Sequence, residues 1–278
     1  MGRHMGLTAI SYGGGVQSTA LVVLAATGQL PFKVDAALFA NVGDDSEHPA
    51  TLNYVRDIAI PWAAERGLPI HELTKTKRGG EQARGLWSHI MEHDDPDTLR
   101  EPIPVRGMNG APLSRSCTVD WKVKVVGKWL KAHGASKDDP ATVCIGISTD
   151  EITRVSNKRV EPYERPIYPL IDLGLDRSAC QRVIAEAGLP VPGKSSCFFC
   201  PFHRPQMWAE MRRDEPDLFF MAADLEATLI ARRTARGKDP VYLTRFGVPL
   251  TLAVSEAQDM LPGFAPDMET CDNGYCWT

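Results

Sequence analysis

Glycines and hydroxyl side chains near the amino terminus form the stretch with the clearest capacity for chemistry. Gly13–Gly15 are followed by Ser18 and Thr19, after an apolar run over Leu7–Ile10 and before an apolar helical pattern. This order predicts a strand, a tight loop and the first turn of a helix. Glycines let the backbone approach a ligand closely, and the N–H groups at a helix start favour an anion. We therefore expect a phosphate-binding loop, in which Ser18 and Thr19 cap the helix or donate to phosphate oxygens.

The class of this loop is restricted by what it lacks. No lysine follows the glycines in the register of a Walker loop, so that class of nucleotide site is excluded. Ser18 stands where a dinucleotide-binding G-x-G-x-x-G motif needs its last glycine. A glycine-rich turn that binds no ligand remains the alternative.

Cysteines form a second chemical cluster. Cys197 and Cys200 have C-x-x-C spacing, which lets two thiolates reach one metal ion or cluster, but they make only half a site. Cys117 is a candidate third ligand, and His203 or a cysteine of the tail, Cys271 or Cys276, a candidate fourth. Cys117, Cys197, Cys200 and His203 together would suit Zn²⁺. For Cys144 and Cys180, which lie in apolar and helical patterns, we expect places in the core.

Acidic residues follow the second apolar run. Asp44, Asp45 and Glu47 are hard oxygen ligands of the kind that Mg²⁺ takes beside phosphates. The alternative is a charged turn before a helix.

Strand-like and helical patterns alternate along the chain. This alternation predicts an α/β fold with a twisted parallel sheet, helices on both faces, and ligands at the carboxyl ends of the strands. We expect two parts, a nucleotide-binding domain over 6–190 and a smaller helical, cysteine-containing, metal-binding region over 191–278. The predicted strands are Leu7–Ile10, Asp35–Asn41, Pro69–Leu73 and Ala141–Ile147, and the predicted helices are Ser18–Thr27, Pro49–Arg66 and 118–133.

The segment 75–116 is longer than an ordinary connection, so we expect a lid or a substrate loop. Its basic residues predict either a solvated loop or a surface for a phosphate-bearing substrate. They are Lys75, Lys77, Arg78, Arg84, Arg100, Arg106 and Arg115.

Composition narrows the class of protein. The 278 residues are 43% hydrophobic, enough for a full core, and the net charge of −4 implies no global attraction to nucleic acid. Seven cysteines without a secretion signal favour thiol or metal chemistry over a disulfide framework. The absence of a signal peptide or membrane-length apolar run predicts a cytoplasmic protein with no membrane partner.

Three segments, in order, resemble the PP-loop ATP pyrophosphatase superfamily, in the branch of phosphoadenosine-phosphosulfate reductases and their bacterial and phage relatives. Gly13-Gly14-Gly15-Val16-Gln17-Ser18 is similar to the S-G-G-x-D-S loop, with Gln17 at the Asp position. Residues 39–51 are similar to F-x-D-T-G-x-x-F-P-E-T, with Asn41-Val42-Gly43 at Asp-Thr-Gly. Residues 146–154 are similar to G-x-R-x-x-E-S-x-x-R, with Ser148 at the first Arg. The resemblance covers about residues 7 to 230 and implies a Rossmann-like PP-loop domain.

The resemblance also implies which residues act. ATP would be bound by Ser11, Gly13, Gly14, Gly15, Gln17, Ser18, Thr19, Phe39, Asn41, Gly43, Asp44 and Gly146, with Mg²⁺ at its phosphates. Catalysis would rest on Cys117, Lys122, Arg154, Asp150 and Glu151. Cys117 lies in a segment that starts a helix in the family, where a lowered thiol pKa is expected. In iron–sulfur members, cysteines at the places of Cys117, Cys197 and Cys200 bind a [4Fe-4S] cluster.

These implications lead to three hypotheses of function. The first is an ATP pyrophosphatase that adenylates an acceptor for sulfur transfer to a nucleic acid or nucleotide, as in DNA phosphorothioation or tRNA thiolation. A cysteine desulfurase or another sulfur donor would be its partner. The second is a phosphoadenosine or adenosine phosphosulfate reductase. The third is a non-catalytic nucleotide-binding subunit of a modification complex. The oligomeric state is left open, a dimer included.

Overall fold

The computed structural model describes residues 6–77, 79–92, 101–155 and 161–254, which form two compact units. Of these, the first unit contains 6–77, 79–83, 120–155 and 161–196, and the second contains 84–92, 101–119 and 197–254. None of the described helices is both long enough and apolar enough to cross a membrane.

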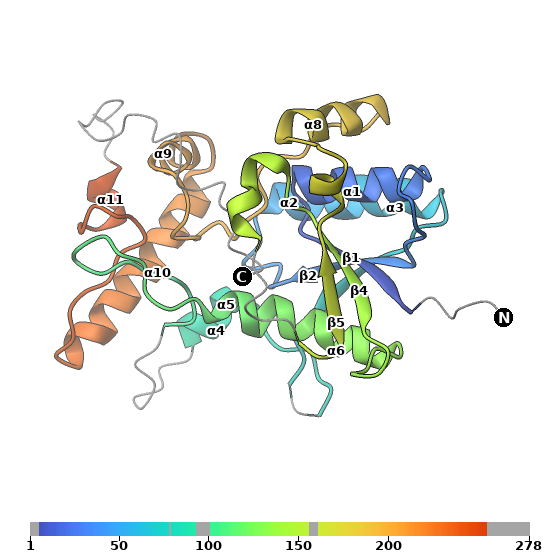
Figure 1. Cartoon of the computed structure of the whole chain (residues 1–278). Helices are drawn as coiled ribbons and strands as arrows, with labels where there is room; N and C mark the ends of the chain where they lie inside the picture. Colours follow the sequence, from blue (N-terminus) through green and yellow to red (C-terminus); the bar gives the residue numbers. More distant parts are fainter. Residues whose placement is uncertain (1–5, 78, 93–100, 156–160, 255–278) are drawn as a thin grey trace. The chain divides into compact units, whose positions relative to one another are not determined.

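A five-stranded, all-parallel sheet forms the centre of the first unit, and the predicted α/β fold is confirmed (Figure 1). The strands are β1 (Thr8–Tyr12), β2 (Ala36–Asn41), β3 (Ile70–Thr74), β4 (Ala141–Ile145) and β5 (Glu164–Ile167), in the order β3-β2-β1-β4-β5. In the register, Ile10 of β1 lies opposite Ala37 on one side and Cys144 on the other. The direction of strand addition reverses at β1, and such a switch point is where parallel sheets bind ligands.

Helices cover both faces of this sheet (Figure 1). On one face α1 (Val16–Ala26), the run α2 (Pro49–Asn53), η1 (Tyr54–Ala59) and α3 (Ile60–Ala64), and α8 (Arg177–Glu186) pack on Ile10, Ala37 and Phe39. On the other face, η2 (Val119–Val123) leads into α6 (Lys124–Ala132), which packs on Leu38 and Val143. Because β1 and β2 are buried on both faces, their sequences are nearly continuous apolar runs. Short η3 (Thr149–Arg154) and α7 (Pro169–Asp172) follow β4 and β5.

The differences from the predicted elements have simple physical reasons. The sequence analysis missed β5, whose residues Glu-Arg-Pro-Ile lack an apolar run because the strand is an edge strand and only partly buried. Helix α1 begins at Val16 rather than at Ser18, because Gly15 takes the N-cap position. The segment 75–116 contains α4 (Leu86–Glu92) and divides between the two units after Ala83.

The second unit is mainly helical, with α4, α5 (Ser116–Thr118), α9 (Pro205–Asp214), α10 (Pro216–Ala235) and α11 (Leu250–Ala253). Glu226 of α10 is buried, and its two carboxylate oxygens accept the N–H groups of Leu243, at 2.7 Å, and Leu250, at 2.5 Å. Burial raises the pKa of Glu226 to about 7, although both hydrogen bonds act in the opposite direction. This one carboxyl group therefore ties α10 to the chain that leads into α11.

Candidate nucleotide site and cysteine segment

The glycine-rich loop is closed on itself by the Ser18 side chain. The Ser18 hydroxyl accepts the N–H of Gly13 and donates to the carbonyl of Gly15, both at 3.2 Å. The prediction that Ser18 caps α1 is therefore wrong, because Gly15 is the N-cap and forms no side-chain cap. The N–H groups of the first turn have no partner within the helix, so they are available to an anion at the carboxyl end of β1.

Three glycines are required by close packing around this loop. Gly14 has φ +74°, and a Cβ there would lie 3.0 Å from Cγ2 of Thr51 and 3.1 Å from Cγ2 of Val55. A Cβ on Gly15 would lie 3.0 Å from Oγ of Ser195, and one on Gly146 would lie 2.9 Å from the backbone nitrogen of Ser18. Gly146 thus lets the chain after β4 approach the loop after β1. Gly146 was predicted to contact the nucleotide. Because it has no side chain, it leaves room for the backbone of Ser18.

Gln17 connects the loop to two other segments of the first unit. Its Nε2 donates to Oγ of Ser148 at 3.4 Å, and its Oε1 accepts from Nη1 of Arg177 at 3.2 Å. The backbone N–H of Arg177 donates to Asp150 at 3.0 Å. Gln17 of the loop after β1 and Ser148 of the segment after β4 are therefore bonded to one another.

Arg177 is a candidate ligand that the sequence analysis missed. Among the described residues, its guanidinium group makes only the hydrogen bond to Gln17, so it has further N–H donors beside the phosphate loop. The signal in the sequence is weak: Asp176 caps α8 through the N–H of Ala179, and Arg177 is merely the first residue of that helix.

Arg154 and Glu151, both predicted to act in catalysis, form an ion pair within η3. Only 10% of the Arg154 side chain and 6% of the Glu151 side chain are exposed. Arg154 thus has a carboxylate partner from its own segment, and a phosphate would have to compete with it. The structure keeps Asp150 and Glu151 in the first turn of η3, as the sequence order requires.

Thr19 and Phe39 point into the core rather than toward a ligand. The Thr19 hydroxyl lies 3.4 Å from that of Tyr12, and Thr19 is 1% exposed, which leaves it unable to cap α1 or reach a phosphate. Phe39 is also 1% exposed, and its ring is 6.0 Å from that of Tyr12. Ser11, in β1, is buried as well. These positions can contribute to a nucleotide site through the backbone.

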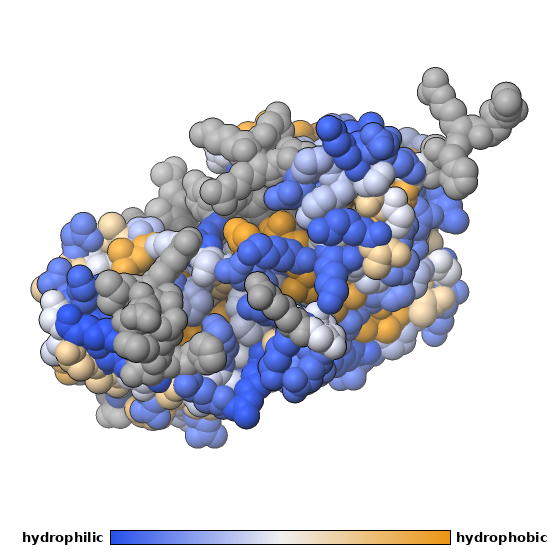
Figure 2. Space-filling model, turned by 90° about the horizontal axis from the view of Figure 1, so that it is seen from below, coloured by the Kyte–Doolittle hydropathy of each residue, from blue (hydrophilic) through white to orange (hydrophobic). Residues whose placement is uncertain are grey.

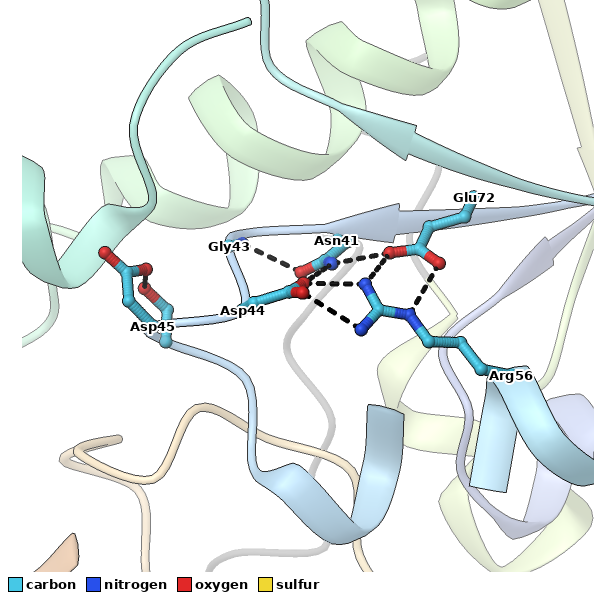
Figure 3. Close-up of polar contacts among 7 residues, drawn as sticks. Asn41, Gly43, Asp44, Asp45, Arg56 and Glu72 are labelled. Carbon is cyan, nitrogen blue, oxygen red and sulfur yellow. Dashed lines mark hydrogen bonds and ion pairs between the residues drawn. The ribbon is translucent and has the colours of Figure 1, made fainter. Parts of the chain in front are cut away.

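The turn after β2 is held by a polar network around Arg56 (Figure 3). The guanidinium group of Arg56 bonds both carboxylate oxygens of Asp44, at 2.7 and 2.9 Å, and both of Glu72, at 2.5 and 3.0 Å. Nδ2 of Asn41 donates to Asp44 and Glu72, each at 2.7 Å, and its Oδ1 accepts the N–H of Gly43 at 2.8 Å. Hydrogen bonds from Arg56 are the main cause that lowers the pKa of Asp44 and that of Glu72.

This network favours asparagine over aspartate at position 41. An aspartate has no donor, so it would place a third carboxylate against Asp44 and Glu72 around one guanidinium. The amide instead donates to both acids and keeps an acceptor for Gly43.

The acidic residues of this turn do not form the expected magnesium site. Asp44 is bonded to Arg56, Asp45 accepts the hydroxyl hydrogen of Ser46 at 2.6 Å, and Glu47 forms an ion pair with Lys122 at 3.3 Å. Glu47 is buried, and 21% of the Lys122 side chain is exposed. Lys122, a predicted catalytic cation, is thereby placed beside the turn after β2, within the first unit.

Cys197, Cys200 and His203 lie in a tight turn of the second unit. The N–H of Cys200 donates to the carbonyl of Cys197 at 3.1 Å, and the N–H of His203 donates to that of Cys200 at 2.9 Å. Cys117 is the second residue of α5, so its predicted place at a helix start is confirmed. All three cysteines are half-buried.

Two arginines bring the Cys117 segment and the C-x-x-C turn together. Arg106 donates to the carbonyl of Pro201 at 3.2 Å, and its guanidinium carbon lies 5.6 Å from the ring centroid of Phe202. Arg115 lies 5.4 Å from the same centroid. Arg115 is two residues before Cys117 and Phe202 is two residues after Cys200, so the two segments are neighbours within this unit.

The expected metal ligands nevertheless do not form a closed set. Within 6–77, 79–92, 101–155 and 161–254, no three His, Cys, Asp or Glu side chains gather closely enough to hold a metal ion. Among the described residues, Cys117, Cys197, Cys200 and His203 are therefore not gathered around one centre. Cys144 and Cys180 are fully buried, as predicted, and burial raises the pKa of each thiol to about 12. Cys271 and Cys276 lie outside the described residues.

The basic residues of 75–116 that are described contact other parts of their own unit. Lys75 lies over the Trp121 ring at 4.2 Å, Lys77 pairs with Glu81, and Arg84 pairs with Glu92. Arg106 and Arg115 hold Phe202, as above, and Arg78 and Arg100 lie outside the described residues. The contacts of these arginines and lysines thus lie within their own units.

No protein-family model matches this chain, and no curated protein matches it. Among solved structures, it is similar to the U34-tRNA thiolase NcsA from Methanococcus maripaludis with its [4Fe-4S] cluster. The two are 12% identical, and the match covers 81% of this chain and 74% of the thiolase, with a TM-score of 0.39. A likeness at this identity and score carries no functional argument.

Proposed function

We propose that the first unit binds ATP and cleaves it to AMP and pyrophosphate, and that the adenylated product is an intermediate for sulfur transfer to a nucleic acid. The observation that carries this proposal is the closed Gly13–Ser18 loop at the switch point of the sheet. The start of α1 has no side-chain cap. The loop is not a Walker loop, because no lysine stands in the required register after the glycines. Cys117, Cys197 and Cys200 supply the link to sulfur chemistry.

The chain's own groups have defined roles in this proposal. The N–H groups at the start of α1 hold the pyrophosphate portion, and Arg177 donates to its oxygens from beside Gln17. Lys122 of η2 supplies a second positive charge beside the turn after β2, where it pairs with Glu47. These donors are fixed before the substrate arrives, which is how preorganised groups stabilise developing charge.

The proposed reaction breaks one bond of ATP. An acceptor oxygen attacks the α-phosphorus, the bond between this phosphorus and the α–β bridging oxygen breaks, and pyrophosphate leaves with the electron pair. The outer sulfur of a donor persulfide then attacks the adenylated carbon, and AMP leaves with the electron pair of its carbon–oxygen bond. A second thiol of the donor attacks the inner sulfur of the S–S bond, so the donor becomes a disulfide and the outer sulfur stays on the acceptor.

Product analysis tests this proposal. Protein purified without oxygen should convert ATP to equal amounts of AMP and pyrophosphate in the presence of added Mg²⁺, acceptor RNA or DNA and a persulfide donor. ADP and phosphate as products would contradict the proposal. Sulfite released from a phosphoadenosine phosphosulfate substrate, without use of ATP, would assign the chain to the reductases instead. If the protein turns over neither nucleotide, the result would favour the third hypothesis, a non-catalytic nucleotide-binding subunit.

A further inference from the structure

The exposed face of α6 carries three lysines in helical register. Lys124, Lys128 and Lys131 are exposed at positions i, i+4 and i+7, while Val126 and Leu130 face the core. In Figure 1, α6 lies below the sheet of the first unit, and Figure 2 views the molecule from that side. The surface over this unit is mostly hydrophilic there.

Two of these three charges have only neutral partners among the described residues. Lys128 donates to the Thr76 hydroxyl at 2.7 Å, and Nζ of Lys131 lies 4.7 Å from the centroid of the Tyr163 ring. Lys124 pairs with Asp120 at 2.6 Å. The face therefore keeps a net positive charge although the whole chain has a net charge of −4.

Stacked aromatic rings border these lysines. The rings of Trp129 and His133 are parallel within 16°, with centroids 3.7 Å apart, and His71 of β3 lies 5.3 Å from Trp129. Trp129 is half-buried against the core, whereas His71 and His133 are exposed. His133 is therefore stacked on Trp129, whereas the ring of His71 is tilted by 37° to that of Trp129.

We propose that this α6 surface, made of His71, Lys124, Lys128, Trp129, Lys131 and His133, binds single-stranded nucleic acid. Lysines that lack acidic partners neutralise backbone phosphates, and stacked aromatic rings receive unpaired bases of any sequence. From Lys124 to Lys131 the helix axis rises roughly 10 Å.

The surface is continuous with the helix that reaches the candidate nucleotide site. Lys122, which pairs with Glu47 after β2, belongs to η2, and η2 continues directly into α6. Lys122 and Lys131 are separated by roughly 14 Å along the helix axis. The inference deepens the proposed function, since it names the acceptor as a single strand, but binding to the surface needs neither ATP nor the phosphate loop.

Equilibrium binding measurements on the full chain test this inference. The two probes are a fluorescein-labelled, unstructured 20-nucleotide RNA and a labelled DNA of the same sequence. The double variant Lys128→Gln/Lys131→Gln should bind at least about 10-fold more weakly than wild type at low salt. The slope of log affinity against log salt should fall by about 1.4, or about 0.7 per lost phosphate contact. The matched control is Lys33→Gln/Arg182→Gln, which removes two exposed charges elsewhere on the first unit.

A second variant separates base stacking from charge. His133→Ala removes an exposed ring and should weaken binding of both oligonucleotides while leaving binding of inorganic polyphosphate of equal length unchanged. Preference for RNA or for DNA would then identify the strand. Absence of oligonucleotide binding would overturn the inference, as would a double variant that binds like its control. Equal losses of polyphosphate and oligonucleotide in His133→Ala would also overturn it. Failure of ATP cleavage, by contrast, affects only the proposed function.

Discussion

The phosphate loop and the C-x-x-C turn differ in how completely their predicted ligand groups are positioned by contacts within the chain. In the loop, Ser18 bonds Gly13 and Gly15, Gln17 bonds Ser148 and Arg177, and Gly146 fits against the backbone of Ser18. In the turn, backbone bonds and two arginines bring the cysteine segments near one another, yet the described side chains form no metal-binding group.

This difference indicates which of the two sites the folded chain forms without a further ligand. An anion site built from backbone N–H groups is complete once the helix and its loop fold, because those groups are fixed by the helix itself. A thiol site needs side chains that converge within bonding distance of one centre. We therefore expect the nucleotide site to work without the cysteines.

The largest effect is expected at Gly14. Gly14→Ala places a Cβ 3.0 Å from Thr51 and 3.1 Å from Val55 at φ +74°, so the loop must shift and ATP affinity should fall at least about 100-fold. Gly28→Ala is the matched control, since Gly28 has φ +69° with no heavy atom within 4 Å of the added Cβ. Calorimetric titration with ATP measures both. Equal affinities of the two variants would show that the loop does not bind the nucleotide.

The second largest effect concerns Glu226 in the second unit. Its pKa is about 7 in the folded chain against an ordinary 4.5, so folding favours the protonated form. Its contribution to stability is therefore full below about pH 4.5 and is lost as pH rises through 7, on the order of 2–3 kcal/mol. Urea unfolding at pH 5 and pH 8 measures this loss.

Glu226→Gln should flatten that pH dependence and cost about 1–3 kcal/mol at pH 5, because its amide nitrogen cannot accept the N–H of Leu243 or Leu250. Asp224→Asn, exposed on the same helix, is the control. A variant at 226 that keeps the wild-type pH dependence would exclude Glu226 as its source.

The next largest effect is expected for substitution of Arg177, which should change the affinity for ATP rather than the stability of the fold. Arg177→Met removes the guanidinium group beside Gln17 and should weaken ATP binding about 10-fold, with less effect on adenosine. Arg182→Met, exposed on the same helix, should bind ATP as wild type does. Equal losses for ATP and adenosine would mean that Arg177 supports the loop and does not contact phosphate.

The smallest effect is expected in the turn after β2. Asn41→Asp replaces the donor to Asp44 and Glu72 by a third carboxylate and should lower stability by about 1 kcal/mol at pH 7. The loss should shrink as pH falls through the pKa values of these acids, which Arg56 holds below their usual range. Thermal unfolding at pH 7 and at about pH 3 checks this, and a loss that grows in acid would contradict the repulsion argument.

The sequence predicted strands β1 to β4, and the buried ones, β1, β2 and β4, are nearly continuous apolar runs. It missed β5, whose half-buried edge position requires no such run. It misplaced the cap of α1, since Ser18 can bond within the loop as well as at a helix start. Arg177 was missed because its contact with Gln17 joins residues 160 positions apart. Long-range partners also hold Asp44 and Glu47, which local spacing alone presented as magnesium ligands.

The most direct test compares ATP binding in a variant without the three cysteines, Cys117→Ala/Cys197→Ala/Cys200→Ala, with that in wild type and in Gly14→Ala. Calorimetric titration should give the triple variant an affinity within about 2-fold of wild type, while Gly14→Ala loses binding. A triple variant that loses ATP, together with a Gly14→Ala variant that keeps it, would contradict the assignment of the nucleotide to the phosphate loop.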